Sequence, residues 1–441
     1  MPEKILEAEQ RRQLEALLKE DLSESEHKRA KLLLLLDDGI GTAEAAREVG
    51  LSAGRARHWR SSFHSEGLQI FHRDEQEAVI AIEESQVSVE AALQVNLAPV
   101  EVAAPSTDAS IKPSLDEFTV AAADLKSPGV QPDDVLAEAG RKVMRFHFAQ
   151  MLQHEEGTRL GEDIEELHDM RVATRRMRAA FEVFEDAFNP KAIKPLLKGL
   201  RATGRSLGRV RDLDVFIEKA ERYLGTLSPE RHSELQPLLQ NWAKERELDR
   251  EEMVAYLDDQ KYARFKQDFF RFATTPGVGV RRNPGTGFAP SRVRDIAPVL
   301  IYARIASVRA FDAILETASL EQFHALRIEF KKLRYSVEFF REVLGEESKA
   351  VIDDLKRIQD HLGDLNDAQV ATGILGDFLI EWDRQQNSLP VSQRRSPEPI
   401  LAYLTYRYNE RLRLMQTFKT AWAHFNRPEF QQNLALAVSA L

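Results

Sequence analysis

The sequence HDMRVATRRMR at residues 168–178 recurs 156 positions later as HALRIEFKKLR at residues 324–334. Each copy begins with histidine and has basic residues at its fourth, eighth, ninth and eleventh positions. A second pair of motifs keeps nearly the same separation, since LGRVRDLDV at residues 207–215 matches LGDLNDAQV at residues 362–370, 155 positions later. Because both motifs and their spacing recur, the chain contains an internal duplication of about 140 to 150 residues per copy.

Both copies have the composition of helices. They are rich in Leu, Ala, Glu, Lys and Arg and contain few alternating β-branched residues. We expect helix breaks at Asn189-Pro190, Gly208, Gly225, Gly345 and Gly363. The predicted fold is therefore all-α, with a four-helix bundle in each half, over residues 132–273 and 295–441, and an approximate twofold axis between the bundles.

The basic residues of each copy share one face of their helix. At about 100° per residue, those of the first copy fall within an arc of roughly 80°. The two stripes are His168, Arg171, Arg175 and Arg178, and His324, Arg327, Lys331 and Arg334, with Arg176 and Lys332 beside them. Cations stacked in this way repel one another, and few acids share the face. A polyanion relieves the repulsion, and phosphate oxygens fit the guanidinium fork, so the stripes predict a site for repeated phosphate groups.

Other basic residues are expected to extend this surface. Some lie on the helix expected over residues 196–207 and on its counterpart in the second copy, and two occupy matching positions upstream, 163 residues apart. They are Lys198, Arg201, Arg205, Lys356, Arg357, Arg141 and Arg304. The alternative is that a charged helix face is merely solvated, but duplication in the same register favours a binding surface.

Charge is unevenly distributed along the chain. The formal net charge is −10, yet residues 74–129 hold eleven acids and only two lysines, so the remainder is close to neutral. This segment also has four prolines and mostly small apolar residues, which predicts a linker. Its acids serve solubility, or they compete for the basic site within the molecule. The expected domains are residues 1–73, 74–129 and 130–441.

Composition excludes several classes of protein. The absence of cysteine excludes disulfide scaffolds, thiolate metal sites and cysteine nucleophiles. The longest leucine run, residues 32–36, is far shorter than the roughly 18 residues that cross a bilayer. The charged beginning, MPEKILEAEQRR, has no apolar segment typical of a secretory signal. We therefore expect a cytoplasmic protein without a cofactor.

The first seventy residues predict a small helical module. Thr42 is expected to cap a helix over residues 43–49 that Gly50 ends, and Ser52 to cap a second helix reaching about residue 64. The pattern resembles the helix-turn-helix modules of transposase-like and regulatory proteins. The second helix has no acid from residue 53 to 64 and would face DNA with Arg55, Arg57, His58 and Arg60. A docking module with solvated arginines is the alternative.

From about residue 132 to the C-terminus, the chain resembles the CHAD family, the "conserved histidine α-helical domain". The resemblance rests on the two His-x-x-Arg-x-x-x-basic-basic-x-Arg helices and covers about 310 of 441 residues. It implies two pseudo-twofold four-helix bundles around a basic channel that binds inorganic polyphosphate, with the two stripes as its walls and Arg201, Arg205 and Lys356 next to them. It also implies a location at polyphosphate granules, or at the nucleoid if the first module binds DNA.

Two other functions stay open on the sequence alone. One is an enzyme that cleaves or transfers phosphate, although the alternating Glu-x-Glu-x-Lys signature of the triphosphate tunnel enzymes that accompany many CHAD domains is absent. The other is a nucleic-acid-binding protein that uses both basic surfaces. A non-catalytic role is expected.

The chemistry of single residues near the stripes leads to three further expectations. Four neighbouring cations argue against a divalent metal at His168-Asp169, so no metal site is expected. Asp212 and Asp367, each four residues after a glycine, are expected to cap helices. An imidazole facing phosphate should gain a proton in mild acid, near its ordinary pKa of about 6.5, and so strengthen binding.

Overall fold

The computed structural model is helical almost throughout. Apart from isolated β-bridges that join Val135 to Arg292 and Phe188 to Val280, the residues it describes contain no strand. These are residues 6, 8–18, 24–50, 56, 60, 63, 68, 115, 118, 125–281 and 291–441. Within them, no helix is both long and apolar enough to span a membrane. The all-α class expected from the repeats is confirmed.

Residue contacts divide the chain into two compact units. The larger, which we call the repeat unit, comprises Ala98–Lys219, Arg250–Thr372 and Thr405–Leu441. The smaller, which we call the N-terminal unit, comprises Met1–Leu97, Ala220–Asp249 and Gly373–Leu404. The expected linker over residues 74–129 lies almost wholly outside the described residues, so its bounds stay a prediction.

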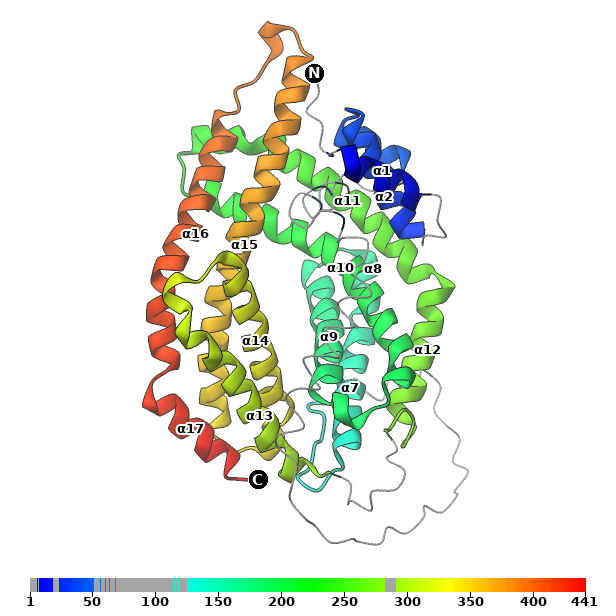
Figure 1. Cartoon of the computed structure of the whole chain (residues 1–441), viewed down its shortest axis with the longest axis vertical. Coiled ribbons are helices and arrows are strands. Elements are labelled where there is room, and N and C mark those ends of the chain that lie inside the picture. Colours follow the sequence, from blue (N-terminus) through cyan, green and yellow to red (C-terminus); the bar gives the residue numbers. More distant parts are fainter. Residues whose placement is uncertain are drawn as a thin grey trace. The chain divides into compact units, whose positions relative to one another are not determined.

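The duplication reappears in the order of the helices (Figure 1). In the first half they are α7 (Leu136–Gln153), the short α8 (Glu155–Leu160), α9 (Ile164–Val183), α10 (Pro190–Leu224), α11 (Gln236–Asp258) and α12 (Gln260–Thr274). In the second half they are α13 (Val293–Arg309), α14 (Leu320–Phe339), α15 (Ser348–Asn387), α16 (Glu398–Phe425) and α17 (Pro428–Val438). In the described part of the chain, each half thus has five helices of at least 11 residues, where about four were expected.

Two of the expected helix breaks are wrong. Gly208 lies inside α10 and Gly363 inside α15. A glycine within a helix costs only about 1 kcal/mol relative to alanine, which packing along such long helices outweighs. Gly208 also leaves the surface of α10 open to Arg171, whose Nε lies 3.7 Å from where a Cβ would stand. The breaks at Asn189-Pro190, Gly225 and Gly345 are confirmed.

A cluster of aromatic rings holds each half together. In the first half, the ring centroids of Phe148 on α7 and Phe269 on α12 lie 4.9 Å apart. In the second half, those of Phe330 on α14 and Phe425 on α16 lie 5.0 Å apart. Each buried side chain of this size contributes roughly 1.5–3 kcal/mol relative to exposure. Phe181 of α9 joins the first cluster, with its ring centroid 6.2 Å from that of Phe269, so this packing fixes which faces of α9 and α14 turn inward.

Helix caps set the register of the two histidine helices, which pack against each other. The Asp163 side chain accepts a hydrogen bond from the backbone N–H of Glu165 at the start of α9. Ser319 and Gln322 form a capping box at the start of α14. Such caps stabilise a helix end by about 1 kcal/mol each. Both stripes therefore begin in the second turn of their helix.

The N-terminal unit contains three described short helices near the start of the chain. They are α1 (Ala8–Leu17), α2 (Glu24–Asp37) and α3 (Thr42–Glu48), and α2 packs against both others. Arg11 joins α1 to the end of α2, with its Nη1 2.6 Å from an oxygen of Asp37 and its Nη2 2.8 Å from one of Asp38. The buried side chains of Leu14 and Leu33 belong to one hydrophobic cluster that joins α1 to α2.

The expected helix over residues 43–49 is present, but its expected cap is wrong. Gly41 occupies the cap position without a side-chain hydrogen bond, and Thr42 is already helical. Gly50, with φ of 66°, follows the end of the helix as expected. Of the second expected helix, only Ala56, Arg60 and Phe63 are described, and all three are helical. The helix-turn-helix assignment therefore stays a prediction.

Candidate polyanion-binding site

Four cations from the two copies of the repeat converge where α9 meets α14. Arg171 and Arg175 of α9 both act electrostatically on Arg327 and Lys331 of α14. All four residues are half-buried. We call these four residues the central cation cluster. It brings together the middle of each stripe.

The central cation cluster has little neutralisation of its own. Arg171 donates to Asp212 at 3.3 Å, but no ion pair or side-chain hydrogen bond of Arg175, Arg327 or Lys331 is found in the described part of the chain. The Nε atoms of Arg175 and Arg327 are buried and lack a hydrogen-bond partner there. A buried donor without an acceptor costs roughly 1–3 kcal/mol. An anion that supplied acceptors here would remove that cost.

Burial and mutual repulsion reduce the basicity of the cluster. Burial, and then the charges of Arg327, Arg175 and Arg171, lowers the pKa of Lys331 from 10.5 to about 7. Burial also lowers the pKa of Arg327, although the charge of Asp367 opposes the shift. Both shifts mean that the charged form is disfavoured in the unliganded chain. A bound anion favours the charged form and would reverse them.

The two stripe histidines have different surroundings. Burial, followed by the charge of Arg211, lowers the pKa of His168. His324 is exposed, and its Nδ1 lies 2.9 Å from the Oδ1 of Asn366. The expected protonation of His168 near its ordinary pKa therefore requires a lower pH in the unliganded chain, because burial and a neighbouring cation both disfavour the imidazolium.

The remaining stripe cations flank the cluster, and most of them are paired. Arg176 and Arg334 both bind Glu338, at 3.2 and 2.9 Å, which ties α9 to α14. Lys332 pairs with Glu329 at 2.8 Å. Arg178 is exposed and makes a contact of its own. These residues can attract a polyanion, but the paired ones would then bind it and their present carboxylate partners at the same time.

Two of the expected cations, Arg141 and Arg357, are engaged in contacts within the fold. Arg141 is 2% exposed and donates to the backbone carbonyls of Phe272 and Val278 and to Glu138. Arg357 donates to the buried Asp354. Both were expected in the basic surface because their positions match the repeat. Matching sequence positions did not reveal that the guanidinium of Arg141 points into the core.

We expect Arg141→Met to destabilise the fold without weakening anion binding. The substitution leaves two carbonyls without their donor, at roughly 1–3 kcal/mol each, so the free energy of unfolding should fall by roughly 2–4 kcal/mol. Urea denaturation measures this loss. An unchanged stability together with weakened polyphosphate binding would instead return Arg141 to the binding surface.

Five other expected cations lie on neighbouring helices. Lys198, Arg201 and Arg205 are exposed on α10, and Lys356 is exposed on α15. Arg201 and Arg205 precede Gly208 by seven and three residues, so they lie on the same side of α10 as the glycine that faces Arg171. Arg304, half-buried on α13, acts electrostatically on Glu185.

The two aspartates that were expected to cap helices lie inside helices instead. Asp212 and Asp367 lie within α10 and α15, so their assignment as helix caps is wrong. Asp212 accepts from Arg171, and Asp367 binds Lys219 at 2.9 Å. Lys219 belongs to no expected set. Its signal in the sequence was weak because its partner lies 148 residues away.

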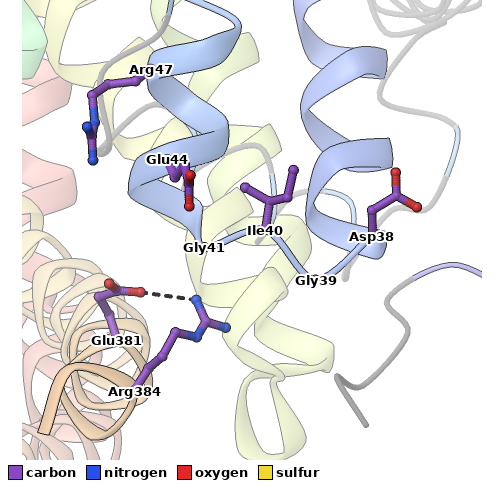
Figure 2. A pocket seen from close by; sticks show the side chains of 8 residues that line it. All are labelled: Asp38, Gly39, Ile40, Gly41, Glu44, Arg47, Glu381 and Arg384. Carbon is purple, nitrogen blue, oxygen red and sulfur yellow. Dashed lines mark hydrogen bonds and ion pairs between the residues drawn. The ribbon is translucent and has the colours of Figure 1, made fainter. Parts of the chain in front are cut away.

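A separate cavity of about 490 Å³ lies in the N-terminal unit (Figure 2). Its lining includes the loop over residues 38–41 and two side chains of α15, Glu381 and Arg384, which pair at 3.2 Å. No residue of the central cation cluster lines it.

A second, smaller cavity in the same unit concerns the expected DNA-binding residues. Arg60 lines it beside the acids Asp377 and Glu381. Of the four residues expected to contact DNA, Arg60 is thus the one the structure describes, and its position is beside acids. Arg55, Arg57 and His58 lie outside the described residues.

Within the residues that the structure covers, no group of three or more His, Asp or Glu side chains is placed to hold a metal ion.

Comparison with known families matches residues 142–376 to the model of the CHAD domain. This match covers more than half of the chain and includes both histidine helices. The chain belongs to the CHAD family. The family is linked to polyphosphate binding, and the CHAD domain here contains the whole central cation cluster.

Relatives of this CHAD protein include two uncharacterized proteins of Mycobacterium tuberculosis, from strains CDC 1551 and H37Rv. Each is 28% identical over 217 residues, which are 46% of this chain and 39% of the relative. The chain thus covers about two fifths of the length of these relatives.

Two solved structures are also similar to the chain. The crystal structure of the CHAD domain from the plant Ricinus communis has a TM-score of 0.48 and 22% identity, covering 71% of this chain and 94% of that one. PptA from Streptomyces chartreusis has a TM-score of 0.49 and 14% identity, covering 69% and 100%.

Proposed function

We propose that the chain binds inorganic polyphosphate at the central cation cluster and does so without catalysis. The observation that supports this most is that four half-buried cations from two copies of a repeat meet, and three of them form no ion pair among the described residues. A polymer with one charge per phosphate can neutralise all four at once.

Exposed cations on α10 and α15 extend the proposal to longer chains. Arg201, Arg205 and Lys356 would contact phosphates beyond the cluster and raise affinity with chain length. If four contacts dominate, the logarithm of the affinity should fall with the logarithm of salt concentration with a slope of roughly −3, at about −0.7 per contact as for single-stranded nucleic acids.

A competition titration of the full chain tests the class of ligand. Labelled long-chain polyphosphate is displaced by unlabelled polyphosphate, duplex DNA or single-stranded RNA at one fixed salt concentration. The proposal requires polyphosphate to displace the label at the lowest concentration. Stronger displacement by either nucleic acid would favour a nucleic-acid-binding protein, including one that uses the first module for DNA.

The non-catalytic part of the proposal has its own test. Phosphate release from polyphosphate, measured with magnesium and with manganese, should stay at the level without protein. Release that depends on protein concentration would establish the enzyme alternative.

The proposal also includes a location at polyphosphate granules or at the nucleoid, and DNA binding by the first module. Imaging the tagged chain in cells that lack polyphosphate tests this part of the proposal.

We expect affinity for long-chain polyphosphate to fall as the pH rises from 6 to 9. Lys331, with a pKa of about 7, is mostly charged at pH 6 and mostly neutral at pH 9 before the ligand binds. Binding favours its charged form and therefore takes up a proton above pH 7. Internal phosphates of a long chain stay ionised throughout this range, and burial lowers the pKa of His168, so we assign the decline in affinity between pH 7 and 9 to Lys331.

Lys331→Arg is the matched control for this pH dependence, since arginine keeps its charge in proteins. Titration of both proteins at pH 6, 7, 8 and 9 should show a declining affinity for the natural chain and a nearly constant one for the variant. Equal slopes in the two proteins would remove Lys331 from the account.

A further inference from the structure

The two halves of the repeat differ at one position beside the histidines. In the motif pair at residues 207–215 and 362–370, Arg211 of the first copy matches Asn366 of the second. Each lies one residue before an aspartate and near the stripe histidine of its own half. The duplicated site therefore has an arginine beside one stripe histidine and an amide beside the other.

Arg211 is held in place with unused hydrogen-bonding capacity. Its side chain is 11% exposed, and its Nη1 is buried without a hydrogen-bond partner among the described residues. Among the described residues, the one carboxylate paired with it is Glu165, which lies 3.9 Å from its Nη2, beyond hydrogen-bond distance. A guanidinium in this state gains from an acceptor that brings two oxygens.

The histidines beside Arg211 and Asn366 also differ, in whether they have a hydrogen-bond partner. His324 already has a partner, because its Nδ1 lies 2.9 Å from the Oδ1 of Asn366. His168 has no hydrogen-bond partner in the part of the chain that is described, and Arg211 is the charge that most opposes its protonation. A neutral imidazole next to Arg211 still offers one N–H donor.

The acids near this end do not occupy those donors. The charges of Glu165 and Asp169 raise the pKa of His168, whereas that of Arg211 lowers it. The Glu165 side chain is 59% exposed, and Asp169 lies 3.9 Å from the Nε2 of His154. Asp212, the next residue after Arg211, accepts from Arg171.

We propose that Arg211, together with His168, binds the terminal phosphate group of a polyphosphate chain, and that the second half binds internal phosphates. The proposal rests on the function proposed above and adds a direction to it. A terminal phosphate has three unshared oxygens and carries up to two charges near neutral pH, whereas an internal one has two such oxygens and one charge. Two guanidinium N–H groups and one imidazole N–H match the terminal group.

Exchange variants test the direction of binding. The probes are a linear polyphosphate of defined short length and the same polymer with both ends capped as alkyl phosphoramidates. The natural chain should bind the uncapped polymer at least about tenfold more tightly, the effect of one charge-assisted contact. Arg211→Asn, which copies the second half, should lose that preference and keep its affinity for the capped polymer. Asn366→Arg, which copies the first half, should retain the preference.

The possible outcomes distinguish a failure of this inference from a failure of the proposed function on which it rests. If the natural chain binds neither polymer, the proposed function fails. If it binds both equally, or if Arg211→Asn weakens both to the same extent, the terminal assignment is wrong while polyphosphate binding stands. A second readout covers a variant that does not fold: in the natural chain, NMR titration of His168 should show a larger rise in its pKa with the uncapped polymer than with the capped one.

Discussion

Reversing two charges of the central cation cluster, with Arg175→Glu and Lys331→Glu in one protein, should abolish polyphosphate binding. Each lost charge-assisted contact is worth about 1.5–3 kcal/mol, and the new carboxylates also repel the ligand. At about 1.4 kcal/mol per tenfold change, the dissociation constant should rise by at least about a hundredfold. Isothermal titration with long-chain polyphosphate measures the change.

The fold should tolerate this double reversal. The two introduced carboxylates would face Arg171 and Arg327, so the substitution replaces repulsion by attraction within the cluster. The control is Lys191→Glu with Lys261→Glu, two exposed lysines, which changes the net charge by the same amount. Retained affinity in the Arg175/Lys331 variant, or an equal loss in the control, would contradict binding at the cluster.

Lys331→Met should make the unliganded chain more stable and its binding weaker. The pKa of Lys331 is lower in the folded chain, at about 7, than the ordinary 10.5 of the unfolded chain. Charging Lys331 therefore opposes folding, fully below pH 7 and progressively less as the pH rises towards 10.5. One pKa unit corresponds to about 1.4 kcal/mol, and partial exposure reduces the total, so we expect a gain on the order of 1–3 kcal/mol at pH 6.

Urea denaturation at pH 6 and pH 9.5 measures this difference between the natural chain and the variant. The stabilisation should shrink at the higher pH, because the lysine is then largely neutral in the folded chain. Lys356→Met, at an exposed position of α15, should change stability by less than about 0.5 kcal/mol at either pH. A destabilising Lys331→Met at pH 6 would show that the charge of this lysine is not a cost to the fold.

The duplicated motifs predicted most of the framework around the candidate site. The two histidine helices, their stripes and the all-α class follow from local periodicity, which the packing preserves. The two stripes were expected as facing walls of a channel, but the direct packing of α9 against α14 was not predicted. The lowered pKa of Lys331 could not be predicted, because its first cause is burial, followed by the charges of Arg327 on the same helix and of Arg175 and Arg171 on α9, and packing decides both the burial and the nearness of α9.

The sequence predictions that failed had applied a rule about local sequence without knowledge of how the helices pack. Gly208 and Gly363 suggest helix ends, yet long helices continue through them. Asp212 and Asp367 therefore do not cap helices as expected, and they contact Arg171 and Lys219 instead. Arg141 matched Arg304 in the repeat, but its position on the inward face of α7 buries it. The exchange of Arg211 for Asn366 was visible in the aligned motifs and was missed because only matching positions were compared.

A crystal structure of the full chain with a bound polyphosphate tests the central claim most directly. The account predicts a phosphate chain between α9 and α14, with phosphate oxygens within hydrogen-bond distance of Arg175, Arg327 and Lys331. A chain bound elsewhere, with these three side chains still lacking an anion, would contradict it.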